Sequence, residues 1–190
     1  METNFIEEKN FDKIDFRRNI LDKGEYENCT FTNCSFYNAD ISERIFIDCK
    51  FTACDLSVVK VNGTTFNGVK FNGCKMLGVR FESCNDFSLS INFENCILNH
   101  SSFFRKKIRK TIFNNCQLVE TDFTECDLTN SLFSNCELTR TVFKNTIIVK
   151  ADFRTSFNYT IDPESNRIKN AKFSLAGAAG LLDKYEIIIE

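Results

Sequence analysis

Apolar residues recur at every fifth position along most of the chain. The series runs without a break from Phe11 to Phe81 and resumes, two residues out of phase, from Phe93 to Phe153. All 28 positions of the two series are apolar, although apolar residues make up only 43% of the sequence. A period of five matches neither the 3.6 residues of a helical turn nor the two-residue alternation of a strand. We therefore expect each group of five residues to form one side of a regular coil.

A second position of the repeat, two residues before each large apolar residue, holds small side chains. Most of them are Cys, Thr, Ser, Val or Ala, as at Cys34, Cys54 and Thr121. In an extended segment, residues two apart point in the same direction. We expect both positions to point inward. The other three residues of each repeat, commonly Asn, Asp, Glu, Thr, Ser or Lys, should face solvent.

This repeat resembles that of the pentapeptide-repeat family, whose pattern is roughly Ala-(Asp/Asn)-Leu-x-x. The pattern stands at Ala39-Asp40-Ile41, Cys54-Asp55-Leu56, Cys126-Asp127-Leu128 and Ala151-Asp152-Phe153. The resemblance covers the chain from Phe11 to Phe153. It implies an all-β fold, a right-handed quadrilateral parallel β-helix with four pentapeptides in each coil and a short C-terminal capping helix.

A coil of four pentapeptides requires residues 20 positions apart, or 22 across the insertion, to stack in columns. One such column contains Phe31, Phe51, Phe71, Phe93, Phe113, Phe133 and Phe153, and another contains Cys34, Cys54, Cys74, Cys96, Cys116 and Cys136. About seven coils at roughly 4.8 Å each give a rod of about 34 Å before its caps. The two-residue insertion is expected near residues 85–91, with Asp86-Phe87 at its tip.

The ten Cys residues allow three interpretations: disulfides, metal or iron–sulfur ligation, and core filling. There is no C-x-x-C pair, and the Cys spacings are those of the repeat. Free Cys behaves as a small apolar residue. The pattern therefore favours core filling, and with it a reducing, cytoplasmic compartment.

The composition leaves little for catalysis. The single His, His100, makes a His-rich metal site or a Ser/His/Asp triad hard to build, and no glycine-rich phosphate-binding motif is present. No stretch approaches 18 consecutive apolar residues. We expect a protein that is not an enzyme, has no cofactor or metal, and makes no contact with a membrane.

The two ends are expected to cover the open edges of the rod. We predict an N-terminal cap at residues 1–10, the β-helix at 11–173 with a loop at 155–167, and a tail at 174–190. Ser174 should cap a helix over residues 175–184, and residues 185–189 should form a strand or hook packed on an apolar surface. The apolar tail either caps the rod or also forms a twofold dimer interface. The candidate interface residues are Leu175, Ala178, Ala179, Leu181, Leu182, Tyr185, Ile187 and Ile189.

The tail also resembles the C-terminal cap of the Qnr and McbG group of pentapeptide-repeat proteins. The matching segments are residues 158–168, Ala171-Lys172-Phe173 and residues 180–187. This resemblance implies a DNA mimic that binds type II topoisomerases, DNA gyrase or topoisomerase IV, and modulates quinolone sensitivity. The alternative is an interaction rod for a different, unknown protein partner. Direct nucleic-acid binding is not expected.

Two charged segments are candidate contact surfaces. Residues 111–139 contain five acids and no Lys or Arg, which predicts an acidic band that a basic DNA-binding surface would accept. Residues 105–110 contain five bases, which are either a solvated face or a contact for an acidic partner. The candidates are Glu120, Asp122, Glu125, Asp127, Glu137, Arg105, Lys107, Arg109 and Lys110, together with Phe87 at the insertion.

Two charged residues occupy inward positions of the repeat. Lys106 and Arg44 both lie two residues before a large apolar centre, where small residues are usual. A buried unpaired charge is costly. We therefore expect the coil to bulge outward at Lys106, and Arg44 to mark a second local bulge.

Overall fold

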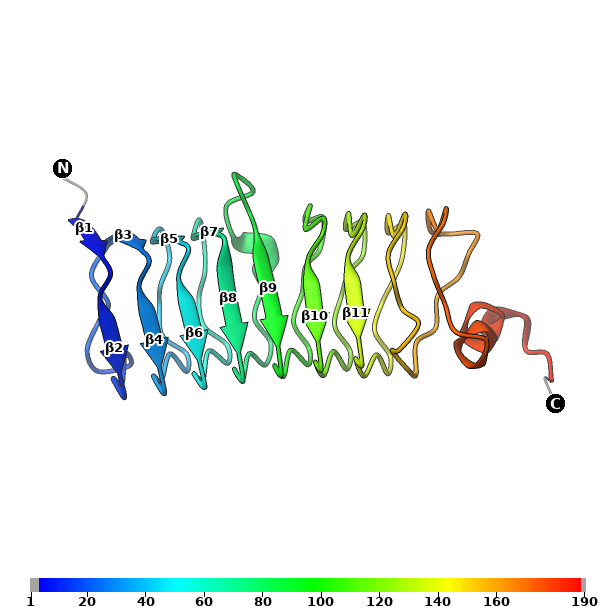
Figure 1. The fold of residues 1–190 in the computed structure, drawn as a ribbon, viewed down its shortest axis with the longest axis horizontal. Helices are drawn as coiled ribbons and strands as arrows, with labels where there is room; N and C mark the ends of the chain where they lie inside the picture. The colour runs from blue at the N-terminus through cyan, green and yellow to red at the C-terminus, as the bar shows by residue number, and fades with distance from the viewer. Residues whose placement is uncertain (1–3, 189–190) are drawn as a thin grey trace.

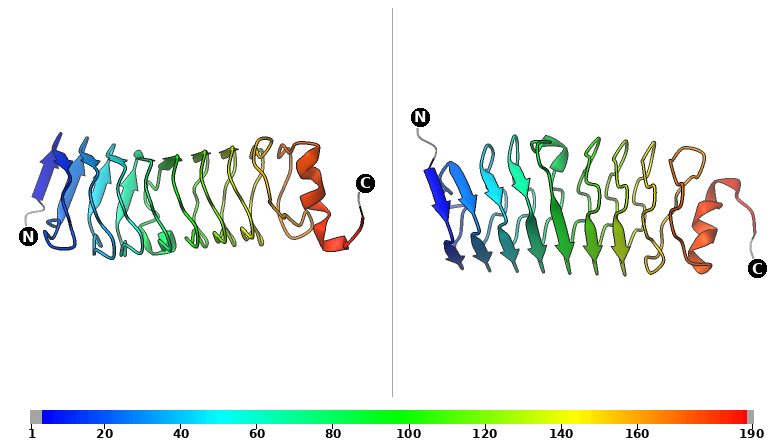
Figure 2. Two further views of the ribbon diagram at one scale, coloured as in Figure 1. Left: turned by 90° about the horizontal axis from the view of Figure 1, so that it is seen from below. Right: turned by 45° about the horizontal axis from the view of Figure 1, so that its top comes forward.

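The computed structural model describes residues 4–188, which form one rod of stacked coils (Figures 1 and 2). The two ends of the chain lie at opposite ends of the rod (Figure 1). All strand pairs are parallel, and each strand pairs with strands one coil before and after it. The rod is a parallel β-solenoid of about seven turns, which confirms the predicted fold class.

Two sides of the rod are continuous sheets. Side 1 carries the four-stranded sheet, made of β1 (Asn4–Glu7), β3 (Gly24–Glu27), β5 (Ile45–Ile47) and β7 (Thr65–Asn67). Side 2 carries the seven-stranded sheet, made of β2 (Asn10–Asp12), β4 (Thr30–Thr32), β6 (Lys50–Thr52), β8 (Val69–Asn72), β9 (Ile91–Glu94), β10 (Ile112–Asn114) and β11 (Leu132–Ser134). Side 2 faces the viewer in Figure 1, and side 1 lies along its upper edge. β1 falls within the segment expected to be an N-terminal cap and pairs with β3.

The other two sides are held by single β-bridges. Side 3 stacks residues from Asp15 to Phe157, and side 4 includes the stack from Arg80 to Val142. Side 1 continues beyond its sheet as a stack of single bridges that joins Lys107, Asp127, Ile147 and Arg167. In each coil these residues follow side 4 and precede side 2, which is the place of side 1. Side 1 therefore runs the whole length of the rod, with the insertion near its middle.

The corners between sides are turns at residues with positive φ. There are 25 such residues besides glycine in the described chain, and ten of them are Asn. Four successive corners hold Gly63, Gly68, Gly73 and Gly78, with φ between 63° and 68°. Asn and Gly tolerate this left-handed backbone better than other residues. The frequent Asn and Gly of the repeat are thus explained by its turns.

The core consists of the columns that the sequence predicts. The rings of Phe31 and Phe51 stack with centroids 4.6 Å apart, and those of Phe113 and Phe133 stack at 4.8 Å. The Phe column also includes Phe11 at one end and Phe173 at the other, both within the predicted β-helix. All ten Cys residues are buried and free, which confirms that they fill the core.

The insertion is a loop on side 1. The Asn85 N–H donates to the Thr64 carbonyl, and the Ser90 N–H donates to the Phe66 carbonyl, both at 2.9 Å. Between these anchors the chain turns at Phe87 and projects beyond the other coils, next to β9 in Figure 1. The short helix η1 (Phe81–Ser83) precedes the loop, and β9 then pairs with β8 in regular register.

The outward bulge predicted at Lys106 is wrong. The Lys106 side chain points inward and is only 5% exposed. Its Nζ donates to the Cys84 carbonyl and to Asp86 Oδ1, each at 2.6 Å, so the ammonium is paired by the insertion loop. The coil keeps its regular backbone, because the Lys106 N–H donates to the Phe103 carbonyl as at other corners.

The bulge predicted at Arg44 is also wrong. Arg44 is 5% exposed and lies in the same inward column as Lys106. Its guanidinium donates to the carbonyls of Ser42, at 2.8 Å, and Leu21, at 2.5 Å. Strand β5 follows directly and pairs with β3 and β7. Backbone carbonyls exposed inside the coil can therefore hold a long cation without any change in its path.

The tail covers the last coil with short helices. The helix η2 (Ala176–Leu181) lies across the end of the rod, and η3 (Asp183–Tyr185) follows (Figure 2). Ser174 Oγ accepts a hydrogen bond from the Gly177 N–H at 3.0 Å, as expected of a capping residue. No helix within residues 4–188 is long and apolar enough to cross a membrane.

The end of the tail differs from the prediction. No strand forms between residues 185 and 188, and the side chains of Tyr185, Ile187 and Ile188 are 51%, 56% and 86% exposed. The tail is attached by Leu181, which packs against the core, and by polar contacts. Lys184 Nζ pairs with Asp162 at 2.7 Å and with Glu164 at 2.5 Å, both in the loop at 155–167.

Candidate partner-binding surfaces

The five predicted acids do not share one side of the rod. Asp127 lies on side 1, Asp122 on side 4 and Glu137 on side 3. Glu120 and Glu125 lie at the corners on either side of Asp122. The acids surround the rod at one level instead of forming a band along one face.

Three of these acids are also ion-paired. Glu125 pairs with Arg105 at 2.7 Å, and Glu120 pairs with Arg140 and lies 3.1 Å from His100. Asp127 is buried and pairs with Arg109 at 2.7 Å. Burial by itself raises the pKa of Asp127, but hydrogen bonds from Arg109 and Thr129 hold it below its usual range. These acids present little uncompensated negative charge.

Asp122 and Glu137 have no cationic partner among the described residues, but both serve the local backbone. Asp122 accepts from the Thr124 N–H at 2.8 Å, and Glu137 accepts from the Thr139 N–H at 2.9 Å. Glu137 also accepts from the Asn158 amide at 2.9 Å. Their role in binding a partner remains a prediction.

The predicted basic segment lies mainly on side 1. Lys107, Arg109 and Lys110 are exposed on this side, and Arg105 lies at its corner with side 4. The Arg105 guanidinium also lies over the Phe104 ring, 4.7 Å from its centroid. Because Arg105 and Arg109 are paired with acids, Lys107 and Lys110 supply the uncompensated positive charge of this segment.

Side 1 also carries a charge pattern that sequence reasoning missed. Its N-terminal half and the adjoining corner with side 2 hold five acids, here called the acidic set: Glu7, Glu8, Glu25, Glu27 and Asp48. Its C-terminal half holds five bases, here called the basic set: Lys107, Lys110, Lys150, Arg167 and Lys169. None of these ten has an oppositely charged side chain within 4.0 Å in residues 4–188.

On sides 3 and 4 an acid and a base are in places bridged between successive coils. Asp55 bridges to Lys75 on side 3, and Asp40 bridges to Lys60 on side 4. On side 1 the two signs are separated by the insertion loop instead. The 20-residue period could have revealed this separation, because Glu7 and Glu27 occupy the same column as Arg109 and Lys169.

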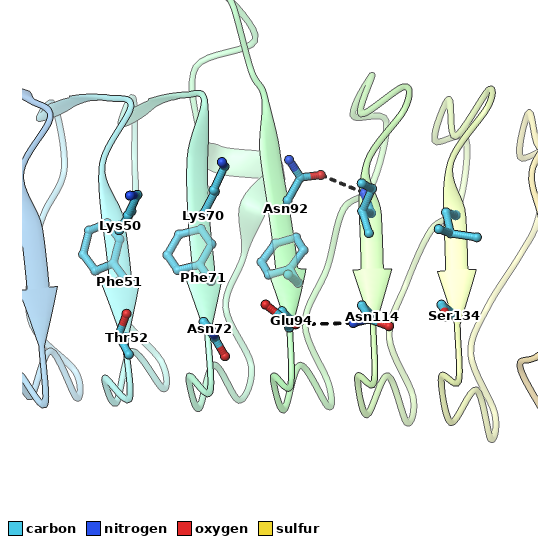
Figure 3. Close-up of a pocket in the computed structure, with 13 residues that line it drawn as sticks. Lys50, Phe51, Thr52, Lys70, Phe71, Asn72, Asn92, Glu94, Asn114 and Ser134 are labelled. Atoms are coloured by element: carbon cyan, nitrogen blue, oxygen red, sulfur yellow. Dashed lines mark hydrogen bonds between the residues drawn. The ribbon is translucent and has the colours of Figure 1, made fainter.

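Side 2 bears a shallow groove of about 590 Å³ above its strands (Figure 3). One of its edges is a row containing Lys50, Lys70 and Asn92, and the other is a row containing Asn72 and Glu94. The groove ends at the partly exposed side chains of Ile112 and Leu132. Its polar lining consists of lysines, amides and hydroxyl groups together with Glu94.

Two exposed apolar features remain. Phe87, at the tip of the insertion loop, is 77% exposed. In the tail, Leu175 is 95% exposed, Leu182, Tyr185 and Ile187 are also exposed, whereas Ala178 is half-buried and Leu181 packs against the core. Ala179 is exposed, and Ile189 lies outside the described residues. A contiguous apolar patch is typical of a contact surface, whereas a single exposed apolar side chain is common on any protein.

The stacked coils, with five residues to a side and four sides to a coil, define a parallel β-solenoid whose outer surface carries any contacts it makes. Residues 24–103 and 77–157 match the family model described as pentapeptide repeat region. The chain belongs to the pentapeptide-repeat family. No curated protein matches it significantly.

Several solved structures share the fold. A trypsin-treated form of QnrB1, a plasmid-mediated fluoroquinolone resistance protein, matches with a TM-score of 0.76 and 18% identity, covering 98% of this chain and 92% of that chain. A second trypsin-treated form matches with a TM-score of 0.66 and 18% identity over 98% of this chain and 100% of that one. Full-length QnrB1 matches with a TM-score of 0.59 and 19% identity, covering 98% of this chain and 100% of that chain.

Proposed function

We propose that this protein is a non-catalytic rod that binds a type II topoisomerase, DNA gyrase or topoisomerase IV, in place of DNA and modulates the action of quinolones. The DNA-binding surface of such an enzyme must be basic, and it selects ligands that carry phosphate-like charge. The observation that carries the proposal is the acidic set, which gives one end of the rod five acids without a cationic partner among the described residues. The fold shared with a fluoroquinolone resistance protein supports the choice of partner.

The ion pairs of the rod lead us to propose other contact residues than the sequence predicts. Of the acids predicted from the sequence, Glu120, Glu125 and Asp127 are neutralised by neighbouring cations. We therefore assign the contact first to the acidic set, with Asp122 and Glu137 as further candidates. Phe87 is the exposed apolar group nearest the middle of the same side, and it would pack against the partner.

A supercoiling assay with DNA gyrase tests the proposal. Increasing protein, with and without ciprofloxacin, should either inhibit supercoiling or restore it in the presence of the drug. The variant Glu7→Lys with Glu27→Lys should weaken this effect at least about tenfold, because reversal replaces attraction by repulsion. The matched control, Glu120→Lys with Glu125→Lys, makes the same change in net charge at acids that are already paired. The absence of inhibition, rescue and binding would refute the proposal, and equal losses in both variants would move the contact elsewhere.

The second candidate function is an interaction rod for a different protein. The net charge of −2 and the basic set favour it, because a DNA mimic would be more uniformly acidic. A rod that binds neither gyrase nor topoisomerase IV while binding another protein through side 1 would establish this function.

We also propose that the exposed tail joins two rods end to end. Leu175, Tyr185 and Ile187 lie beyond the surface that covers the last coil, where they are open to a second tail. In about 500 mM NaCl, which screens contacts between exposed charges, light scattering should give the mass of a dimer for the native chain and the mass of a monomer for Leu175→Asp with Ile187→Asp. A monomeric mass for the native chain would refute the interface.

A further inference from the structure

We propose that side 1 is a self-complementary interface, on which a second copy of this chain lies antiparallel with its own side 1 facing the first. The arrangement is a side-by-side dimer, separate from the end-to-end contact of the tail. It does not require topoisomerase binding, although it would cover the acidic set assigned to that contact.

The first observation is the segregation of charge on this side. The acidic set and the basic set contain five residues each, and none is paired in residues 4–188. Elsewhere on the rod, several charges are neutralised within a coil, as by Arg154 and Asp152, or by the next coil, as by Arg105 and Glu125. Two separated patches of opposite sign on one side fit a partner with the reverse order of charge. A second copy turned end for end has that order.

The second observation is the position of the two sets along the rod. Stepping by coils from Glu7 through Glu27, Ile47 and Asn67 reaches the insertion loop in four steps. From the loop, four further steps through Arg109, Thr129 and Val149 reach Lys169. Each of these four residues lies two positions after a bridged residue of side 1. A twofold axis at the loop therefore places Glu7 opposite Lys169 of the second copy, and Glu27 opposite Val149, which is next to Lys150.

The third observation is the loop itself. It stands out from side 1 at the centre of this arrangement (Figure 1) and carries Phe87, which is 77% exposed. Lys106, from inside the rod, anchors the loop through Asp86 and the Cys84 carbonyl. At the twofold axis the two loops lie beside each other, and the two Phe87 rings form the apolar centre. An apolar centre surrounded by complementary charge is the usual organisation of a protein interface.

The test measures association in the absence of any topoisomerase. The starting protein is the full chain with Leu175→Asp and Ile187→Asp, which removes the apolar tail surface and so separates this dimer from the end-to-end one. Sedimentation equilibrium should show a dimer at about 50 mM NaCl that weakens at about 500 mM, because salt screens exposed charges. A monomer at low salt, or a dimer unaffected by salt, would overturn the proposal.

Charge reversal identifies the surface. In this background, Glu7→Lys with Glu27→Lys, and separately Lys150→Glu with Lys169→Glu, should each weaken association at least about tenfold. The matched control for the second variant is Lys50→Glu with Lys70→Glu on side 2, which changes the net charge equally and should have little effect. An equal loss in the control would show a response to net charge alone and would overturn the proposal.

Mixing the two reversal variants gives the sharpest result. In a mixed dimer, each reversed patch faces a reversed patch of opposite sign, and each native patch faces a native one. An equimolar mixture should therefore associate about as tightly as the starting protein, although neither variant associates alone. Failure of the mixture to associate would refute the antiparallel arrangement.

Discussion

Val58 occupies a corner of the rod whose backbone does not suit it. Its φ is 50°, and it lies between Asn38 one coil earlier and Gly78 one coil later. Among the 25 described non-glycine residues with positive φ, it is the only one that is β-branched. A left-handed backbone raises the free energy of the folded state by about 1–2 kcal/mol for a residue with a Cβ atom. Gly and Asn adopt this conformation at the lowest cost. We predict that Val58→Asn relieves this cost.

The size of the effect is measured against a matched substitution. Val58 is 44% exposed, so replacing it by Asn also forfeits about 1 kcal/mol of apolar burial. Val142 is 43% exposed but lies on the flat of side 4, bridged to Asp122, with no positive φ. Val142→Asn therefore loses similar burial without any relief of the backbone. Val58→Asn should leave the rod more stable than Val142→Asn by about 1–2 kcal/mol.

Urea unfolding at equilibrium measures this difference. Both variants should keep the slope of the native protein, so the difference appears in the midpoint. Val58→Asn is expected to have a midpoint close to that of the native protein, and Val142→Asn a clearly lower one. Equal losses in the two variants would show that the corner backbone is not strained at Val58.

Two further predictions concern the core and the tail. Phe113 is fully buried, and its ring stacks on Phe93 at 5.2 Å and on Phe133 at 4.8 Å between centroids. Phe113→Ala should therefore lower the free energy of unfolding in urea by about 3–5 kcal/mol. The control Phe87→Ala, at an exposed residue, should change it by less than about 0.5 kcal/mol. A loss below about 1 kcal/mol for Phe113→Ala would contradict the stacking argument. In the tail, Lys184 lowers the pKa of both Asp162 and Glu164. A carboxyl whose folded pKa is lowered stabilises the folded contact above its unfolded pKa of about 4, and this contribution is lost as the pH falls through the folded value. Hydrogen exchange in residues 176–185 should therefore be protected at pH 6 and lose protection below about pH 4, after correction for the intrinsic rate; unchanged protection at low pH would show that these ion pairs do not hold the tail.

The five-residue period was sufficient to predict the coil, its columns and the place of the insertion. Each of these depends on which side chains point inward, and that is set by local spacing alone. Whether the Lys106 side chain points inward depends instead on Asp86, which the insertion loop of the previous coil places next to it. The repeat pattern gives the position of Lys106 but not the partner, so a bulge was the simpler expectation.

The functional surface was harder to predict than the core for a related reason. A run of acids along the sequence, such as residues 120–137, passes around the rod and meets several sides in turn. Charges that gather on one side are 20 residues apart, and their effect depends on neighbours one coil away. Arg105 and Arg140, which neutralise predicted acids, come from such neighbouring coils.

The ten buried Cys residues can report where the rod opens. Burial raises the pKa of Cys49 and of Cys84 to about 12, so neither thiol reacts appreciably while its coil is closed. The ten thiols are distributed from Cys29 to Cys136 along the rod. Coils of a solenoid contact only their neighbours and can open locally from an end. The order in which the thiols become alkylated therefore gives the sequence in which the coils separate, without any engineered label.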